Sequence, residues 1–379
     1  MSAKVLRSLA PLAAVLLAAC APETDEPILI GIAGPLTAAN GISMKHAAEM
    51  AAAEINARNG IGGRRIELVW GDDQADAQKA ITVATELASD PRVVAVIGHV
   101  GSAATKEAAP VYNGRTAGVP AVLQISPASS SPELTGAGEW SFRVTPTDLE
   151  FSPILARAAA TRLGRSRAAV LYANDNYGQG VRQTFEAAFR SAGGTVVSAD
   201  PYLGAVLERG DELDPYLQRA FRRGADALVI GGQADAGLKI IQAARRLGYT
   251  GPILGADGLT GVKDAGPIAE GVYVSSAFLP DRDSDLAREF VAKYRAAYDA
   301  LPDHRGAMTY DILYLLRDAI QAAGTDRRRL RDHVARIGTA IPSHEGVSGT
   351  IGFDENGDVR GKEPDLGVVR SGELVTARQ

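Results

Sequence analysis

The stretch that decides the fold is Val93–Thr105, VVAVIGHVGSAAT. Its first six residues are apolar and mostly β-branched, which predicts a strand buried on both faces of a parallel sheet. A glycine and two hydroxyl residues, Ser102 and Thr105, follow and lead into a helical pattern. Hydroxyl groups at a helix start cap backbone N–H groups, and the N–H groups that stay free can hold an anion. The stretch therefore predicts a strand end that either caps a helix or binds a ligand.

The same pattern recurs after one crossover. Residues Pro120–Ile125 predict a second buried strand, and Ser126–Thr135, SPASSSPELT, predicts a polar loop at its carboxyl end. Ligands of open α/β sheets bind at the carboxyl ends of the strands. Capping alone accounts for Thr105 or Ser131 taken singly, but two adjacent loops of this kind favour a binding site.

Strand and helix patterns alternate along most of the chain, and a length of 379 residues predicts two domains. This order predicts right-handed parallel crossovers. The fold class we expect is α/β, with two doubly wound parallel-sheet lobes joined by three hinge crossings, a build that permits closure around a ligand. The predicted boundaries are residues 28–145 plus 277–350 for lobe 1 and residues 146–276 plus 351–379 for lobe 2.

The first 19 residues have the pattern of a lipoprotein signal peptide. Lys4 and Arg7 precede an apolar run that is too short to span a bilayer and that ends in Leu17-Ala18-Ala19-Cys20. An ordinary secretory signal that happens to contain a cysteine is the alternative. Cys20 is the only cysteine in the sequence, which excludes an internal disulfide. We expect Cys20 to carry a lipid, residues 20–27 to form a tether, and the protein to lie in the cell envelope, held to the membrane only by that lipid.

Composition and motifs exclude several classes of function. A net charge of −5 argues against a nucleic-acid partner. The five histidines lack metal-ligand spacing, and the sequence contains no nucleophile elbow and no P-loop. The segment DENGD at 354–358 resembles the start of a calcium loop, but Val359 replaces the required glycine, so we interpret the segment as a tight turn. We therefore predict no metal, no cofactor and no enzymatic activity.

Several further motifs occur in a characteristic order. They are GIAGPLT at 31–37, DDQADAQKA at 72–80, YANDNYGQG at 172–180, ILGADG at 253–258 and GTIGFDENGD at 349–358. Together with the two loops above, they resemble the periplasmic leucine/isoleucine/valine-binding family, the type I solute-binding proteins of ABC importers. The resemblance extends from Ile28 to about Gly372. It implies two lobes that trap a ligand between their strand ends.

The resemblance also implies which residues bind the ligand. In the first lobe, Ser102 and Ser130 would donate to a ligand carboxylate, and the carbonyl of Ala128 would accept from an ammonium group. In the second lobe, Asp257 would pair with the ammonium, helped by Tyr177. An Asp-Gly turn is the alternative for Asp257, and simple packing is the alternative for Tyr177.

Two positions depart from the family pattern. Gln233 lies at a strand end that we expect to face the same cleft, where relatives often have an aromatic residue. The first loop, Thr37–Ser43, is shorter than in relatives and lacks their aromatic lid. Either the small residues of this loop leave room for a bulkier ligand, or Phe278 or Tyr112 supplies the lid.

The predicted function is that of a lipid-anchored, monomeric receptor that captures an amino acid of the branched-chain type, or a related small carboxylate, and delivers it to an ABC permease. A ligand-binding sensor or regulator of amides or other small acids is one rival hypothesis. A hydrolase on a similar two-lobed frame is the other. Against the hydrolase, Ser102 and His99 lie three residues apart on one loop, with no acid in sequence to orient the histidine.

Overall fold

The computed structural model describes residues 26–203, 207 and 211–378. Cys20, the predicted signal peptide at 1–19 and most of the predicted tether at 20–27 lie outside the described residues. Within the described ranges, no helix combines the length and the apolar character needed to cross a membrane.

The first lobe is built on a five-stranded parallel sheet with the order β2-β1-β3-β4-β5. Every residue of β1 and β3 is buried, as their apolar sequences predict. Helix α1 packs on one face of the sheet together with the later helix α9, and helices α2 and α3 pack on the other. These elements are β1 (Ile28–Gly34), α1 (Ala39–Ala57), β2 (Ile66–Asp72), α2 (Ala77–Ser89), β3 (Val93–Gly98), α3 (Ser102–Tyr112), β4 (Leu123–Ser126) and β5 (Ser141–Arg143).

The second lobe contains a seven-stranded sheet with the order β14-β13-β10-β9-β8-β6-β7. Strands β6 to β10 are parallel, and the last two strands of the chain add antiparallel at one edge. Its elements are α4 (Asp148–Arg157) with one π-helical turn (Ala158–Arg162), β6 (Arg167–Ala173), α5 (Asn176–Ser191), β7 (Thr195–Tyr202), α6 (Asp214–Arg222), β8 (Ala227–Gly231), α7 (Ala234–Arg246), β9 (Ile253–Gly255), a 3₁₀ segment (Asp257–Ala269), β10 (Tyr273–Ser276), β13 (Asp365–Arg370) and β14 (Glu373–Thr376).

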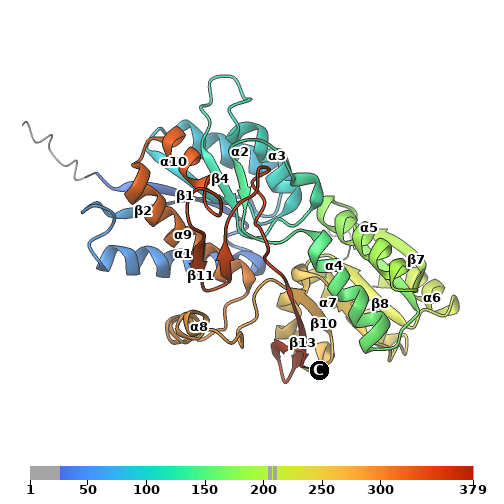
Figure 1. The fold of residues 1–379 in the computed structure, drawn as a ribbon. Coiled ribbons are helices and arrows are strands. Elements are labelled where there is room, and N and C mark those ends of the chain that lie inside the picture. The colour runs from blue at the N-terminus through green and yellow to red at the C-terminus, as the bar shows by residue number, and fades with distance from the viewer. Residues whose placement is uncertain (1–25, 204–206, 208–210, 379) are drawn as a thin grey trace, which may run out of the picture.

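The chain passes between the two lobes three times: after β5, after β10 and before β13. Between the second and third crossings it returns to the first lobe, where α9 packs along α1. Figure 1 shows this as orange and red segments lying beside the blue ones. The predicted α/β fold with two lobes is confirmed. The returning elements are α8 (Asp285–Tyr298), α9 (His304–Ala323), α10 (Arg327–Val334), β11 (His344–Gly346) and β12 (Gly349–Ile351).

The segment that leads into the third crossing contacts the first lobe beyond the predicted boundary at residue 350. The ring of Phe353 meets that of Phe142 edge-on, with centroids 5.1 Å apart. The Arg143 backbone N–H donates to the Gly357 carbonyl, and the Arg143 side chain pairs with Asp358 at 2.6 Å. Residues 353–358 therefore pack with the first lobe, whereas the boundary predicted from the sequence placed them in the second lobe.

The DENGD segment is the tight turn that its sequence predicts. One oxygen of the Asp354 carboxylate accepts from the backbone N–H groups of Asn356 and Asp358. Asp358 in turn accepts from Arg143, whose guanidinium also donates to the carbonyl oxygens of Ser129 and Ser131. This one arginine therefore ties the turn, strand β5 and the loop after β4 together.

We predict that Arg143→Ala lowers the free energy of unfolding by about 3–5 kcal/mol, because it leaves Asp358 and two carbonyl groups without their buried partner. Urea denaturation followed by circular dichroism measures this. Arg288→Ala is the matched control, since that arginine pairs with two exposed aspartates, and its loss should cost at most about 1 kcal/mol. Equal losses for the two variants would contradict the prediction.

Candidate functional site

The first lobe presents two short loops at neighbouring strand ends. Ser102 is the first residue of α3, directly after the loop that follows β3. Ala128 and Ser130 lie in the loop that follows β4. The two loops are joined where the Ser131 backbone N–H donates to the Ser102 hydroxyl oxygen at 3.3 Å. That contact leaves the hydroxyl proton of Ser102 able to donate elsewhere.

Other hydroxyl groups of the same loops bind protein carbonyls instead. Ser126 and Ser129 both donate to the carbonyl oxygen of His99, at 2.7 and 3.2 Å. Thr105 lies 2.6 Å from the Ser129 hydroxyl, and Ser131 caps a short 3₁₀ turn by accepting from the backbone N–H of Glu133. The capping interpretation is therefore correct for Ser131. It is wrong for Thr105, because α3 has no side-chain cap and the Thr105 hydroxyl joins the two loops instead.

The second lobe contributes a carboxylate held at the end of β9. Asp257 is 2% exposed, and one of its oxygens accepts from the Tyr177 hydroxyl at 2.9 Å and from the Gly258 backbone N–H at 3.0 Å. The same N–H group also lies 2.8 Å from the Tyr177 oxygen. A β-carbon at Gly258 would stand 2.6 Å from this oxygen. The glycine after Asp257 is thus required for Tyr177 to approach.

A third group of polar side chains comes from the start of α9 in the first lobe. Asp303 caps this helix by accepting from the backbone N–H groups of Arg305 and Gly306. Its other oxygen accepts from the Arg305 guanidinium at 2.7 Å. The guanidinium then reaches across the cleft to the second lobe, where it donates to Thr260 and to Gln233, both at 3.2 Å.

These three groups enclose one small cavity between the lobes. Its volume is about 10 Å³, about the size of a water site, so an amino acid enters only if the lobes move apart. Five of the six predicted ligand-binding residues line it. Ser130 does not, because it is fully buried beside Asp148, whose backbone N–H donates to its carbonyl. The lining residues are Val100, Ser102, Ala128, Tyr177, Gln233, Asp257, Gly258, His304 and Arg305.

Burial shapes the charge of this site. Burial raises the pKa of Asp257 to about 6, although Arg305 and Tyr177 oppose the shift. Burial also lowers the pKa of His304 to about 3, assisted by the charge of Arg305, so the imidazole is neutral at pH 7. Burial alone would raise the pKa of Asp303, but the charge of Arg305 outweighs this effect and holds the pKa at about 2.

A buried acid lies behind the cleft, at the first crossing. Asp148 is the first residue of α4 and is fully buried. Burial and the charge of Asp257 raise its pKa well above the usual range. Asp148 does not line the cavity, so Asp257 is the carboxylate that faces it.

The expectations about a lid are wrong. Tyr112 is fully buried and bonds His99 at 3.0 Å, and Phe278 is buried in the core against Phe290. Residues 37–43 run into the first turn of α1 and do not line the cavity. A β-carbon at Gly41 would lie 2.1 Å from the Pro35 carbonyl, so small residues are needed there for close packing.

The histidine next to Ser102 has no catalytic geometry. His99 does have an acid partner, since its Nδ1 lies 2.6 Å from Asp73, a contact that sequence spacing did not reveal. Its Nε2, however, faces the Tyr112 hydroxyl and not Ser102. A nucleophile needs a base within hydrogen-bond reach, and this imidazole is engaged on both sides. Within the described ranges, no group of three or more His, Cys, Asp or Glu residues could hold a metal ion.

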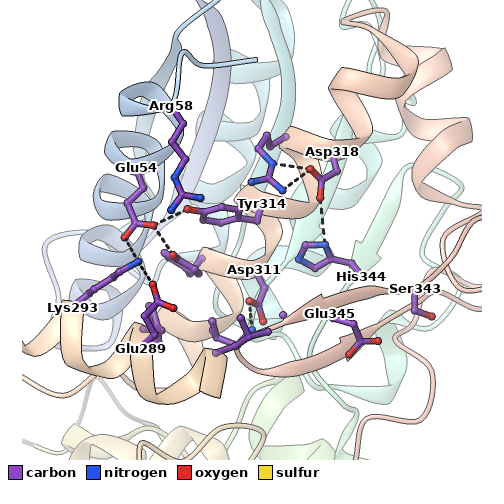
Figure 2. A pocket seen from close by; sticks show the side chains of 16 residues that line it. Glu54, Arg58, Glu289, Lys293, Asp311, Tyr314, Asp318, Ser343, His344 and Glu345 are labelled. Carbon is purple, nitrogen blue, oxygen red and sulfur yellow. Dashed lines mark hydrogen bonds and ion pairs between the residues drawn. The ribbon is translucent and has the colours of Figure 1, made fainter. Parts of the chain in front are cut away.

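A larger cavity, of about 520 Å³, lies on the first lobe between α1, α8, α9 and β11. Figure 2 shows Lys293 between Glu54 and Glu289, and Asp318 facing His344. Glu54 accepts from the hydroxyls of Tyr310 and Tyr314 at 2.7 and 2.6 Å, and Arg317 pairs with Asp318. Of the described side chains that line it, none has a buried polar atom without a partner. The cleft does, at His304 and Arg305, so we take the cleft as the candidate site.

This combination of two lobes and a polar cleft defines a ligand-binding protein. A sequence profile of the periplasmic binding protein family matches residues 27–364, and the chain belongs to that family. The chain is 26% identical over 355 residues to the Leu/Ile/Val-binding protein of Escherichia coli K12, covering 91% of this chain and 90% of that protein.

Solved structures agree with the sequence comparison. An ABC transporter substrate-binding protein of Desulfitobacterium hafniense, in complex with Leu, is 30% identical with a TM-score of 0.78, covering 93% of this chain and 99% of that one. A leucine-binding protein of Thermotoga maritima is 26% identical with a TM-score of 0.83, covering 93% and 98%. The predicted resemblance to this family is confirmed.

Sequence reasoning missed His304 and Arg305. They are the first two residues of α9, which begins at His304. The signal was present: Asp303 follows a proline and precedes helix-forming residues, which is the pattern of an N-cap. A helix that starts there directs its first residues toward the strand ends.

We predict that Asp257→Asn flattens the pH dependence of stability. The pKa of Asp257 is about 6 in the folded chain, against about 3.9 unfolded, so its contribution is present below pH 4 and lost as the pH rises through 6. The wild type should lose about 2 kcal/mol more than the variant between pH 4 and pH 7, at about 1.4 kcal/mol per pKa unit. Urea denaturation at pH 4–7 measures the difference, and parallel curves would contradict it.

Proposed function

We propose that this protein is the extracytoplasmic substrate-binding component of an ABC importer, that it captures an amino acid between its two lobes, and that it delivers the ligand to the permease. The observation that carries the proposal is that Asp257 of the second lobe lines the same cavity as Ser102 and Ala128 of the first lobe. An α-amino acid needs an anion for its ammonium group and donors for its carboxylate. The second lobe supplies the anion, and the loops of the first lobe supply the donors.

The carboxylate subsite lies at the start of α3. Ser102 offers its hydroxyl, and the backbone N–H groups of the first helical turn point the same way. The positive end of the helix dipole favours an anion there. Ser130 is buried in the adjoining loop and does not line the cavity, so we leave it out of this subsite.

The ammonium subsite is formed by Asp257, with Tyr177 holding the carboxylate in place and the Ala128 carbonyl facing it from the other lobe. Contacts from both lobes exist together only when the cleft is closed. A ligand therefore favours closure by the difference between its affinities for the closed and open forms. The permease would then recognise the closed surface.

The location and the anchor are part of the same proposal. Sequence similarity to periplasmic binding proteins supports export, and the predicted lipid on Cys20 would hold the chain at the membrane surface. Mass spectrometry of the mature N-terminus tests the anchor directly: a diacylglyceryl group on Cys20 supports it, and an unmodified N-terminus beyond residue 20 refutes it.

We predict that Asp257→Ala weakens the binding of an α-amino acid by about 10- to 150-fold, since a charge-assisted hydrogen bond contributes about 1.5–3 kcal/mol. Calorimetric titration of the purified protein with the common amino acids first identifies a ligand, and the variant is then titrated with it. Asp318→Ala, in the larger cavity, is the matched control and should bind normally.

A second readout tests closure itself. X-ray scattering should show a smaller radius of gyration when the wild type binds its ligand, and Asp257→Ala should need a higher ligand concentration for the same change. Unchanged affinity in Asp257→Ala would remove this residue from the site. A calorimetric binding signal without compaction in scattering would favour a sensor that works by a different mechanism.

A further inference from the structure

The cleft contains more polar groups than the backbone of an amino acid can use. Building on the proposed function, we propose that Arg305, His304 and Gln233 form a side-chain subsite that selects amino acids whose side chain ends in a carbonyl or carboxylate oxygen. The acidic and amide amino acids have this chemistry. The branched-chain aliphatic amino acids do not.

Arg305 is the centre of this subsite. Its side chain is 3% exposed, and its two terminal nitrogens donate to Asp303, Thr260 and Gln233. The remaining nitrogen, Nε, is buried and has no partner among the described residues. A guanidinium donates in a planar fork, so a free Nε–H beside an engaged terminal nitrogen suits a carboxylate or carboxamide oxygen.

His304 adds a second unsatisfied group. Its imidazole is fully buried, and neither ring nitrogen makes a hydrogen bond within the described chain, although Nε2 lies 3.4 Å from Asp257. A neutral imidazole has one donor and one acceptor. A buried polar atom without a partner is unfavourable, and a ligand that supplies the partner removes that penalty.

An aliphatic side chain would fit this environment poorly. Of the nine residues that line the cavity, only Val100 and Ala128 have aliphatic side chains. Leucine in the cleft would leave the Arg305 Nε and both His304 ring nitrogens without partners. Sites built to hydrogen-bond a polar group reject the analogue that lacks it far more strongly than apolar pockets reject a missing methylene.

The charge balance of the subsite admits both kinds of oxygen. Asp303 already neutralises Arg305 through a contact at 2.7 Å, so a neutral carboxamide can bind without leaving an unpaired cation. A carboxylate gains in addition from the positive potential of the α9 N-terminus, where Arg305 is the second residue. Asp257 stays available for the ligand ammonium.

The test is a calorimetric titration of the ligand-free full chain with glutamate, glutamine, aspartate, asparagine, leucine and benzoate. We expect at least one acidic or amide amino acid to bind at least 10-fold more tightly than leucine. In Arg305→Met this preference should fall to about 3-fold or less. Arg317→Met, in the larger cavity, is the control for loss of an arginine and should keep the full preference.

A second variant guards against misfolding, because Arg305→Met leaves Asp303 without its partner. Gln233 precedes α7 and makes no side-chain cap, so Gln233→Leu should fold normally. It removes the oxygen that positions the guanidinium and adds apolar surface, so it should weaken binding of the polar ligand and strengthen leucine at least 3-fold.

The outcomes separate the two proposals. If leucine binds as tightly as the polar amino acids, or if the preference is unchanged in Gln233→Leu, this inference is wrong while the proposed amino-acid receptor stands. If benzoate binds and no amino acid does, both this inference and the amino-acid ligand are wrong.

Discussion

A charge buried where two lobes meet must find a partner, and this constraint organises the cleft. Asp303 meets it for Arg305 with one oxygen and begins α9 with the other. Asp303 therefore links three features: the start of α9, the direction of the Arg305 guanidinium and the polarity of the cleft. Burial of an unpaired ion costs several kcal/mol, so a change at any of these three residues, Asp303, His304 or Arg305, alters the others.

The same rule holds away from the cleft. Arg143 is 3% exposed and lies where the chain first leaves the first lobe, and it pairs with Asp358 on the segment that leads into the third crossing. Two crossings far apart in sequence are thus fastened together by one ion pair. A hinge of this kind can bend at a few residues but cannot let one lobe drift from the other.

Sequence alone predicted the fold because the buried strands have a clear apolar pattern. Residues 93–98, for example, are apolar at every position before the final glycine, and the loop after them is polar. The resemblance to a known family indicated Ser102, Ala128, Tyr177 and Asp257, and a position at a strand end indicated Gln233. The structure brings these five residues around one cleft. Sequence reasoning did not identify Arg305, because the N-cap at Asp303 was not recognised as the start of α9. It also misjudged Tyr112 and Phe278, because an aromatic residue in a list of letters carries no sign of whether it faces the core or the ligand.

The serine-rich loops of the first lobe have one more consequence. Their hydroxyl groups form hydrogen bonds with the carbonyls of the neighbouring loop or with each other, as Ser126, Ser129 and Thr105 do. These loops are therefore fixed before any ligand arrives. An ordered receptor surface loses little conformational entropy on association. Selectivity among ligands should therefore depend on how well each ligand matches polar groups whose positions are already fixed. Little of the binding free energy is needed to order a loop.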